Sequence, residues 1–329
     1  MRYVILGAGA VGATIGGRLA EAGCAVILVG RGEHAAAVKR NGLILAMPDR
    51  TVQLPVPMVT MEELRLAPED VLFLAVKSQD TSHLLGQLAT VPVDGEASDL
   101  PVFCAQNGVV NEDTVLRYFS RVYGCCVNVP ATHLEPGVVE APATPVSGIL
   151  QLGCYPAGAD DLASAVAADL RRGGFLAEVR ADVMAWKRAK LLSNLANALQ
   201  VLCVGGFEYR AGNNDATGTV VARMRAEAMA CFGAAGWPVT DAGQFRAEAG
   251  AFQMAAVNGR MRGGGSTWQS VERGLPSVET DYLNGEIVRL GRLHGVPTPI
   301  NAAIQAGMRE ITRRRRAPGT LDPADLLAA

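Results

Sequence analysis

The first half of the chain alternates short, continuous apolar runs with longer segments of mixed or small residues. Runs of this kind are typical of parallel strands that are buried on both faces. We predict strands at these runs, over residues 3–6, 25–29, 70–76, 102–105 and 177–179. We predict helices between them, over about 10–22, 78–88 and 160–171 and from about 111. Strands that alternate with helices indicate an α/β fold with a doubly wound sheet of the Rossmann type.

Strand signals disappear after residue 182, and helical patterns take over. The predicted helices lie at about 183–203, 214–235, 240–256, 276–294 and 299–314, and the last dozen residues can add a short one. We therefore predict two domains. Residues 1–181 form a Rossmann-type, cofactor-binding domain, and residues 182–329 form an all-helical domain for substrate and catalysis.

A glycine-rich turn joins the first predicted strand to the first predicted helix. Gly7, Gly9 and Gly12 have the spacing G-x-G-x-x-G, and a second strand follows the helix. In this setting the glycines permit a tight turn, a close approach of the backbone to a pyrophosphate, and close packing of helix on strand. The amides at the helix start favour the anion. The candidate cofactor-binding residues of this turn are Gly7, Ala8, Gly9, Ala10, Val11 and Gly12. The alternative is a glycine-rich turn without a ligand.

The residue after the second strand indicates which dinucleotide is bound. NAD sites commonly place Asp or Glu there to accept a hydrogen bond from the ribose 2′-hydroxyl. Here the position is held by Arg31, and no acidic residue occurs before Glu33. A guanidinium suits a 2′-phosphate through charge-assisted hydrogen bonds, so we predict NADP(H). The alternative is an ordinary solvated arginine.

Composition narrows the functional classes. Hydrophobic residues make up 49% of the 329 residues and charged ones 19%, which is typical of a globular protein, and the net charge of −2 argues against nucleic-acid or membrane-surface partners. No apolar run approaches a membrane span, and we expect no signal peptide because the first strand begins at residue 2. The seven cysteines are an odd set without C-x-x-C spacing, so we expect reduced thiols, no metal site and a cytoplasmic protein. A homodimer is left open, since the apolar C-terminal helices can bury against a partner or against each other.

Three polar residues interrupt the apolar helix predicted from residue 183. At about 100° per residue, Lys190, Asn194 and Asn197 fall within a stripe roughly 60° wide. Such groups need partners, since burying unpaired polar groups is costly. A substrate cleft would supply them, with the lysine ammonium protonating a ketone oxygen as hydride arrives and the amides holding substrate oxygens. The alternative is a surface lysine beside asparagines that serve helix packing.

Two further sets of polar residues are candidates. Lys77 and Asn107 follow predicted strands, and doubly wound sheets bind ligands beyond the carboxyl ends of their strands. Glu279, Asp281 and Asn284 lie at the predicted start of a helix, where acidic residues are commonly ordinary first-turn residues. The four histidines show no metal-ligand spacing, which argues against a metalloenzyme or a histidine-dependent dehydrogenase.

Together these stretches resemble the ketopantoate reductase (2-dehydropantoate 2-reductase) family. The resemblance covers nearly the whole chain in order, through GAGAVG, Arg31, AVKS, QNG, WKRAKLLSN, STWQS, VETDYLNGEIV and HGVPTPIN. It implies a Rossmann domain, a helical C-terminal domain and an active site in the cleft between them. It also implies NADPH-dependent reduction of ketopantoate to pantoate, a step toward pantothenate and coenzyme A.

The resemblance assigns roles by position. Lys190 would be the general acid, and Glu279 would hold the substrate hydroxyl and orient Lys190. Asn107 would lie between nicotinamide and substrate, and Lys77 would reach the cofactor ribose. The remaining substrate-binding candidates are Asn194, Asn197 and, for the carboxylate, Ser266 or Thr267, of which the local alignment favours Thr267.

One departure from the family pattern bears on the substrate. The family often has a second asparagine four residues after the one matching Asn194, whereas this chain has Ala198 and an asparagine at Asn197. Either Asn197 compensates or the pocket accepts another small or branched 2-oxo acid. A β-hydroxyacid-type dehydrogenase fits less well, because that group spaces asparagine before lysine. A non-catalytic NADP(H) sensor would have no use for Lys190 and Glu279.

Overall fold

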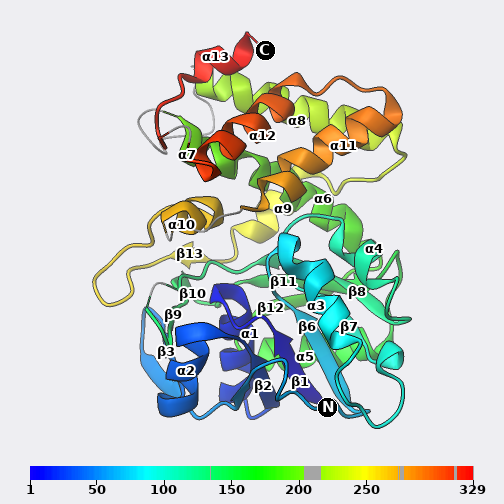
Figure 1. Cartoon of the computed structure of the whole chain (residues 1–329), viewed down its shortest axis with the longest axis vertical. Helices are drawn as coiled ribbons and strands as arrows, with labels where there is room; N and C mark the ends of the chain where they lie inside the picture. The colour runs from blue at the N-terminus through cyan, green and yellow to red at the C-terminus, as the bar shows by residue number, and fades with distance from the viewer. Residues whose placement is uncertain (134, 204–215, 273, 275–277, 315–316, 329) are drawn as a thin grey trace. The chain divides into compact units, whose positions relative to one another are not determined.

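The computed structural model describes residues 1–133, 135–203, 216–272, 274, 278–314 and 317–328. It divides into two compact units (Figure 1). The first unit comprises residues 1–187 and 241–262, and the second comprises 188–240 and 263–329. The boundary predicted after residue 181 falls close to the first crossing between the units, but the return of residues 241–262 to the first unit has no counterpart in that prediction.

An eight-stranded sheet forms the centre of the first unit. In spatial order its strands are β12 (Leu176–Val179), β11 (Ile149–Cys154), β8 (Val122–Asn128), β7 (Val102–Cys104), β6 (Asp70–Leu74), β1 (Arg2–Leu6), β2 (Ala25–Val29) and β5 (Met58–Val59). Neighbours pair in parallel except β8 and β11, which are antiparallel. Each predicted strand is present, and the Rossmann-like fold is confirmed.

Alternating side chains of the central strands enter two separate hydrophobic clusters. Tyr3 of β1 belongs to one cluster, together with Phe73, Phe103 and Tyr123, whose rings follow one another across neighbouring strands. The other cluster includes Leu6 of the same strand. Because both faces are buried, these strands are continuous apolar runs in the sequence.

Helices and a small sheet complete the first unit. Its helical segments are α1 (Ala10–Glu21), α2 (Gly32–Asn41), η1 (Ser78–Asp80), α3 (Thr81–Leu88), η2 (Ala97–Asp99), α4 (Asn111–Val115) and α5 (Asp161–Arg172). The small sheet has the order β4 (Thr51–Leu54), β3 (Leu43–Ala46), β9 (Val138–Glu140).

The segment 241–262 corrects the predicted helix over 240–256. The helix α9 (Ala242–Ala249) is shorter, and β13 (Gln253–Met254) follows it and pairs antiparallel with β10 (Ala143–Thr144). The Glu248 carboxylate anchors α9 by accepting hydrogen bonds from Arg180 and, at 2.8 Å, from Gln151. This strand takes its backbone partners from a segment more than a hundred residues away, which local periodicity cannot reveal.

The second unit is largely helical, as predicted. The helix α6 (Val183–Asn194) begins in the first unit and continues into the second, which also contains η3 (Leu195–Ala198), α7 (Leu199–Leu202), α8 (Ala216–Ala234), α10 (Ser266–Glu272), η4 (Glu279–Tyr282), α11 (Asn284–His294), α12 (Pro299–Thr312) and α13 (Pro323–Leu327). The helix predicted from 276 is instead the short η4 followed by α11. Residues 214–215 and 276–277 of the predicted helices lie outside the described residues. No described helix combines the length and the apolar character needed to cross a membrane.

Candidate functional site

The strand register brings four loops to one edge of the main sheet. Leu6 pairs with Val29 on one side and with Leu74 on the other, and Leu74 pairs with Cys104. The chain therefore leaves four neighbouring parallel strands at the same edge. The loops that leave there carry predicted cofactor residues: Gly7 to Gly12, Arg31, Lys77 and Asn107. The edge also lies at the point where the chain reverses its direction of winding, between β1 and β6, where doubly wound sheets bind ligands.

The three glycines of the turn differ in whether the surrounding protein leaves room for a side chain. Gly7 has φ +104°, and a Cβ there would lie 2.7 Å from the Val76 backbone nitrogen. At Gly12 a Cβ would lie 2.2 Å from the Gly7 carbonyl oxygen. Gly9 has an ordinary φ of −77°, and a Cβ there would meet no protein atom within 4 Å. Packing therefore explains Gly7 and Gly12, while the open space at Gly9 fits a pyrophosphate against the backbone.

The helix α1 begins directly after Gly9, which is its N-cap residue and is exposed. The backbone N–H groups of the first turn, at Ala10, Val11 and Gly12, have no acceptor within the helix itself. These groups and the helix dipole favour an anion at this position. The turn thus has the chemistry that a dinucleotide phosphate requires.

Arg31 lies two residues beyond β2 and is the N-cap residue of α2. It is exposed, and the Gly30 N–H before it donates to the Val59 carbonyl at 3.0 Å, which fixes the backbone at the sheet edge. The position permits the guanidinium to meet a ribose phosphate, and it equally permits a solvated arginine, so the choice of NADP(H) stays a prediction.

A buried polar network joins the loops that follow β6 and β7. The Gln106 amide donates to Thr81 Oγ1 at 2.9 Å. The Asn111 amide donates to Ser78 Oγ at 3.1 Å and to the Asn107 carbonyl at 3.2 Å. The loop that carries Asn107 is therefore held by side chains from two neighbouring connections. Sequence reasoning gave no role to Gln106 or Asn111, although Gln106 is the first residue of the QNG segment that it selected and Asn111 follows that segment closely.

A buried lysine provides a second anchor for the same loop. The Lys187 ammonium donates to the carbonyl oxygens of Cys104 at 3.2 Å and Gln106 at 3.0 Å, and it forms an ion pair with Glu112. The two side chains are 2% and 0% exposed. Burial by itself lowers the pKa of Lys187, but the adjacent Glu112 carboxylate outweighs it and the net shift is upward, so the lysine stays charged. Sequence reasoning missed this pair because its members are 75 positions apart.

The helix that carries Lys190 is not continuous to residue 203, which corrects the prediction. It ends as α6 at Asn194 and continues as the 3₁₀ turn η3, in which Asn197 lies. Residues three apart eclipse in 3₁₀ geometry, so Asn197 falls closer to the line of Asn194 than α-helical geometry predicts. Lys190 and Asn197 are half-buried, and Asn194 is 5% exposed.

A second buried network supports η3 within the second unit. The Asn284 amide donates to the Leu195 carbonyl at 3.2 Å and to Asn301 Oδ1 at 3.1 Å. Asn301 in turn donates to the Glu227 carboxylate at 2.7 Å. The Leu195 carbonyl thereby gains a partner where the helix tightens and its regular hydrogen bonding changes. Asn284 belongs to the VETDYLNGEIV segment, and its contacts are structural.

Two acidic residues of the VETDYLNGEIV segment, Glu279 and Asp281, differ in burial. Glu279 is 6% exposed and starts η4. Asp281 accepts hydrogen bonds from Gln305 at 2.6 Å and from Arg309 at 2.7 Å, and both of these pairs are exposed. Asp281 is therefore explained as an exposed residue that pairs with neighbouring surface side chains. Thr267 is 3% exposed in α10, while the Ser266 side chain lies outside the description.

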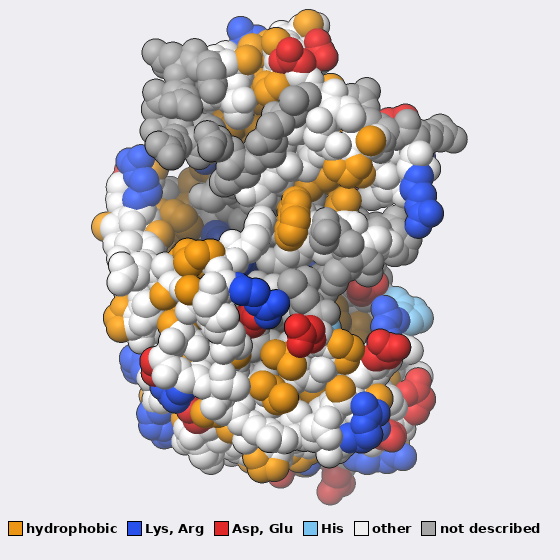
Figure 2. All heavy atoms as spheres, turned by 90° about the vertical axis from the view of Figure 1, so that its left-hand side faces the viewer, with side chains coloured by type: hydrophobic (Ala, Val, Ile, Leu, Met, Phe, Trp, Pro, Cys, Tyr) orange, Lys and Arg blue, Asp and Glu red, His pale blue; other side chains and the backbone are white. Residues whose placement is uncertain are grey.

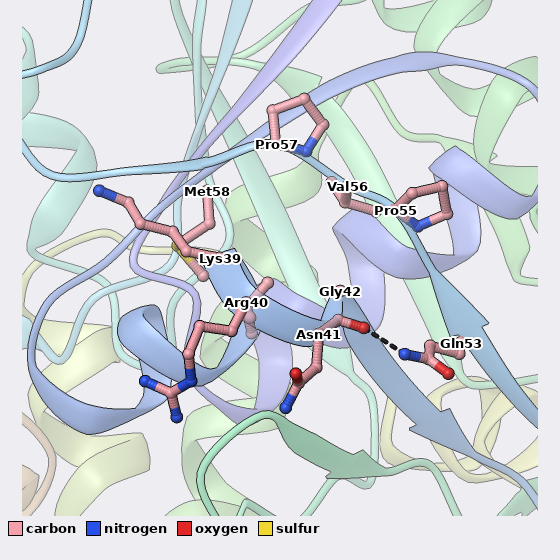
Figure 3. A pocket seen from close by; sticks show the side chains of 10 residues that line it. Lys39, Arg40, Asn41, Gly42, Gln53, Pro55, Val56, Pro57 and Met58 are labelled. Atoms are coloured by element: carbon pink, nitrogen blue, oxygen red, sulfur yellow. Dashed lines mark hydrogen bonds between the residues drawn. The ribbon is translucent and has the colours of Figure 1, made fainter.

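Two cavities in the described parts of the chain contain none of the residues to which the family resemblance assigns a role. One of about 590 Å³ in the first unit is lined by residues 38–42, 53 and 55–58 (Figure 3), where the Gln53 amide donates to the Asn41 carbonyl. The other, of about 210 Å³, is in the second unit and includes Asp281 and Arg309. The cofactor site therefore rests on the convergence of loops at the sheet edge, and neither cavity defines it.

Neither the face drawn in Figure 2 nor the set of metal-ligating side chains points to a second site in the part of the chain that the structure describes. On the face drawn in Figure 2, positive and negative side chains are interspersed, and neither sign covers a continuous area. The described residues contain no group of three or more His, Cys, Asp or Glu side chains that could hold a metal ion. All seven cysteines are free thiols, five buried and two half-buried, and the adjacent Cys125 and Cys126 are strand residues of β8.

Two models of one protein family together match most of the chain. The family model described as ketopantoate reductase PanE/ApbA matches residues 3–157. The model for the C terminal of the same family matches residues 182–312. The chain belongs to the ketopantoate reductase family. This family is the 2-dehydropantoate 2-reductases, which are oxidoreductases, and the resemblance of the motifs is confirmed.

Ketopantoate reductases match the chain over nearly its full length. The 2-dehydropantoate 2-reductase of Pyrococcus horikoshii is 27% identical over 93% of this chain and 96% of its own. The PanE/ApbA family ketopantoate reductase of Ralstonia eutropha JMP134 has a TM-score of 0.77 at 28% identity, covering 96% of this chain and 99% of its own. D-mandelate dehydrogenase in complex with NADH and anilino(oxo)acetate has a TM-score of 0.79 at 22% identity, covering 95% of this chain and 99% of its own, and shows that the fold is shared.

Proposed function

We propose that this protein reduces ketopantoate to pantoate with NADPH. The observation that carries the proposal is family membership across both units, together with Lys190 and Asn194 four residues apart at the carboxyl end of α6. The product places the enzyme in pantothenate and coenzyme A biosynthesis, and we propose a cytoplasmic location and a small-molecule partner.

The residues at the sheet edge fit the phosphates of a dinucleotide. We assign the pyrophosphate to the turn Gly7 to Gly12, because Gly9 leaves open space and the first turn of α1 presents N–H groups. We assign the ribose 2′-phosphate to Arg31 and a ribose hydroxyl to Lys77. The Lys77 side chain is half-buried and lies in the loop that follows β6. When bound, NADPH supplies the hydride.

The remaining roles concern the substrate and its proton. Lys190 donates a proton from Nζ to the substrate carbonyl oxygen as that oxygen gains charge, and Glu279 orients the ammonium and holds the substrate hydroxyl. Asn107 borders nicotinamide and substrate. The substrate oxygens are assigned to Asn194 and Asn197, and the carboxylate is assigned to Thr267 or Ser266, with Thr267 preferred.

The assay that tests this function follows NADPH oxidation by its absorbance with ketopantoate and a panel of small and branched 2-oxo acids, in parallel with NADH. We expect ketopantoate with NADPH to give the highest kcat/KM, by at least about 10-fold over the other acids, because a pocket that pairs each substrate oxygen leaves groups unpaired with a poorer fit. Similar kcat/KM values across several acids, with none favoured for ketopantoate, would refute the substrate assignment and keep the reaction type.

The second candidate is a reductase of another small or branched 2-oxo acid. Ala198 favours it, because this residue is 2% exposed in η3 and carries no amide where the family often has asparagine. The fold is also that of D-mandelate dehydrogenase, whose name specifies another 2-hydroxy acid. A non-catalytic NADP(H) sensor is the remaining alternative. Turnover that depends on Lys190 would exclude it, because a sensor has no use for a general acid.

The cofactor preference has a direct test at Arg31. Replacing Arg31 with glutamine removes the charge that a 2′-phosphate would meet, so NADPH affinity should fall about 10-fold while NADH affinity changes little, as expected for loss of one exposed charge-assisted contact. The measurement is quenching of protein fluorescence by each nucleotide. Arg40→Gln, at the exposed carboxyl end of the same helix, is the matched control and should change neither affinity. An equal loss of affinity for NADPH and NADH would mean that Arg31 contacts a group present in both nucleotides, and would refute its assignment to the 2′-phosphate.

A further inference from the structure

The Lys187 ammonium has an acceptor for each of its N–H groups, and all three acceptors belong to the first unit. It has three N–H donors, and it contacts three acceptors: the Cys104 carbonyl, the Gln106 carbonyl and the Glu112 carboxylate. These acceptors belong to the end of β7, to the loop after it and to α4, while Lys187 itself lies on α6. One side chain therefore ties three separate segments together.

Stability alone gives a weak reason for this arrangement. Moving two charges out of water costs free energy that their attraction only partly offsets, and apolar pairs of similar volume often serve a fold as well. What an apolar pair cannot do is hold the carbonyl oxygens of Cys104 and Gln106. The feature to be explained is therefore the donation to two carbonyls, more than the ion pair itself.

Those two carbonyls lie at the start of the loop that presents Asn107. The Asn107 carbonyl is held on its other side by Asn111, which precedes Glu112 on α4. Lys187 thus fixes the entry to the loop, and α4 fixes its exit. On α6, the residue three positions after Lys187 is Lys190, about one helical turn along the same helix. The anchor therefore holds the turn of α6 that precedes the proposed general acid.

Reactions that transfer a hydride and a proton depend strongly on such geometry, since a displacement of about 1 Å can cost up to about 100-fold in rate. We propose that Lys187, with Glu112, is a positioning residue for the reduction: it holds the Asn107 loop and the turn of α6 before Lys190. This inference rests on the proposed function. The acceptors of the Lys187 ammonium are two loop carbonyls and Glu112, so its effect on the reaction would pass through the segments that carry Asn107 and Lys190.

The test is a double variant, Lys187→Met with Glu112→Leu, which removes both charges without leaving one buried alone. We expect it to fold and to bind NADPH within about twofold of the parent protein, with kcat about 10-fold lower. With NADPH deuterated at the transferred position, the isotope effect on kcat should rise, because hydride transfer becomes slower than the other steps. Amide hydrogen exchange over residues 105–110 should accelerate. A purely structural pair would leave the isotope effect and the exchange of this loop unchanged.

Two further variants keep the result interpretable. Arg2→Met with Asp70→Asn removes another ion pair with a buried carboxylate, at the opposite end of β1, and should lower stability without lowering kcat. Glu112→Asp keeps a carboxylate beside the Lys187 ammonium and so keeps the charged donor to both carbonyls, and we expect it to retain most of the parent's kcat and a normal loop exchange. A loss of kcat in the Arg2 and Asp70 double variant equal to that in the Lys187 and Glu112 double variant, or kcat and exchange in the latter equal to the parent's, would overturn the positioning role.

The outcomes also separate this inference from the proposed function. If the parent protein turns over no 2-oxo acid, the proposed function has failed, and hydrogen exchange over 105–110 alone decides whether Lys187 fixes the loop. If the parent protein is active and the double variant matches it, the function stands and the positioning role is wrong.

Discussion

Replacing Lys190 with alanine should lower kcat about 1,000-fold while NADPH affinity stays within about twofold of the parent's. General acid catalysis is worth about 100- to 10,000-fold, and a methyl group offers no proton to the carbonyl oxygen. The lysine lies on α6, whereas the glycine-rich turn and Arg31 belong to other segments, so nucleotide binding should be preserved. Steady-state kinetics with the best 2-oxo acid and fluorescence titration with NADPH give the two quantities.

The control for this variant is Lys39→Ala, which removes a lysine from an exposed ion pair with Glu63 on the first unit. Its kcat should equal that of the parent protein. Turnover near the parent's in Lys190→Ala would show that the general acid is another group. Failure of the parent protein to reduce any acid, with NADPH still bound, would instead favour the sensor.

Replacing Gly9 with alanine should weaken NADPH binding about 100-fold and leave the melting temperature unchanged. The backbone at Gly9 is in a region that alanine adopts freely, and the added methyl would meet no protein atom within 4 Å. If a pyrophosphate lies against this backbone, the methyl occupies its place and the hydrogen bonds to the first turn of α1 lengthen. Isothermal titration with NADPH and thermal unfolding without nucleotide measure the two effects separately.

Gly12→Ala and Gly86→Ala are the matched comparisons. A Cβ at Gly12 would lie 2.2 Å from the Gly7 carbonyl oxygen, so this variant should unfold at lower temperature even without nucleotide. Gly86 is within α3 and has open space, so alanine there should be neutral or stabilising by about 0.5–1 kcal/mol and leave NADPH binding intact. Unchanged NADPH affinity in Gly9→Ala would mean that no pyrophosphate approaches this turn.

The sequence by itself determined the first unit's core. Strands such as β6, buried along its whole length, appear as continuous apolar runs because both faces of a parallel sheet exclude water. The glycine-rich turn was also predictable from the sequence. Gly7 adopts a left-handed conformation and Gly12 has no room for a Cβ, so each position requires glycine, and that requirement is visible in the residue type. The family motifs added the order of the remaining segments.

The tertiary structure decided what depends on distant partners. The strand β13 forms only because residues 143–144 offer it backbone groups, and Asp281 is an ion-pair residue only because α12 places Arg309 beside it. The 3₁₀ turn η3 interrupts a segment whose hydrophobic pattern predicts one continuous helix, with Asn284 supplying a partner for one freed carbonyl. Lys187 and Glu112 are 75 positions apart, and each resembles an ordinary surface residue in the sequence. Periodicity reports which face of an element is buried, but the partner of a buried charge is set by how whole elements pack, and that information is not local to any stretch of the chain.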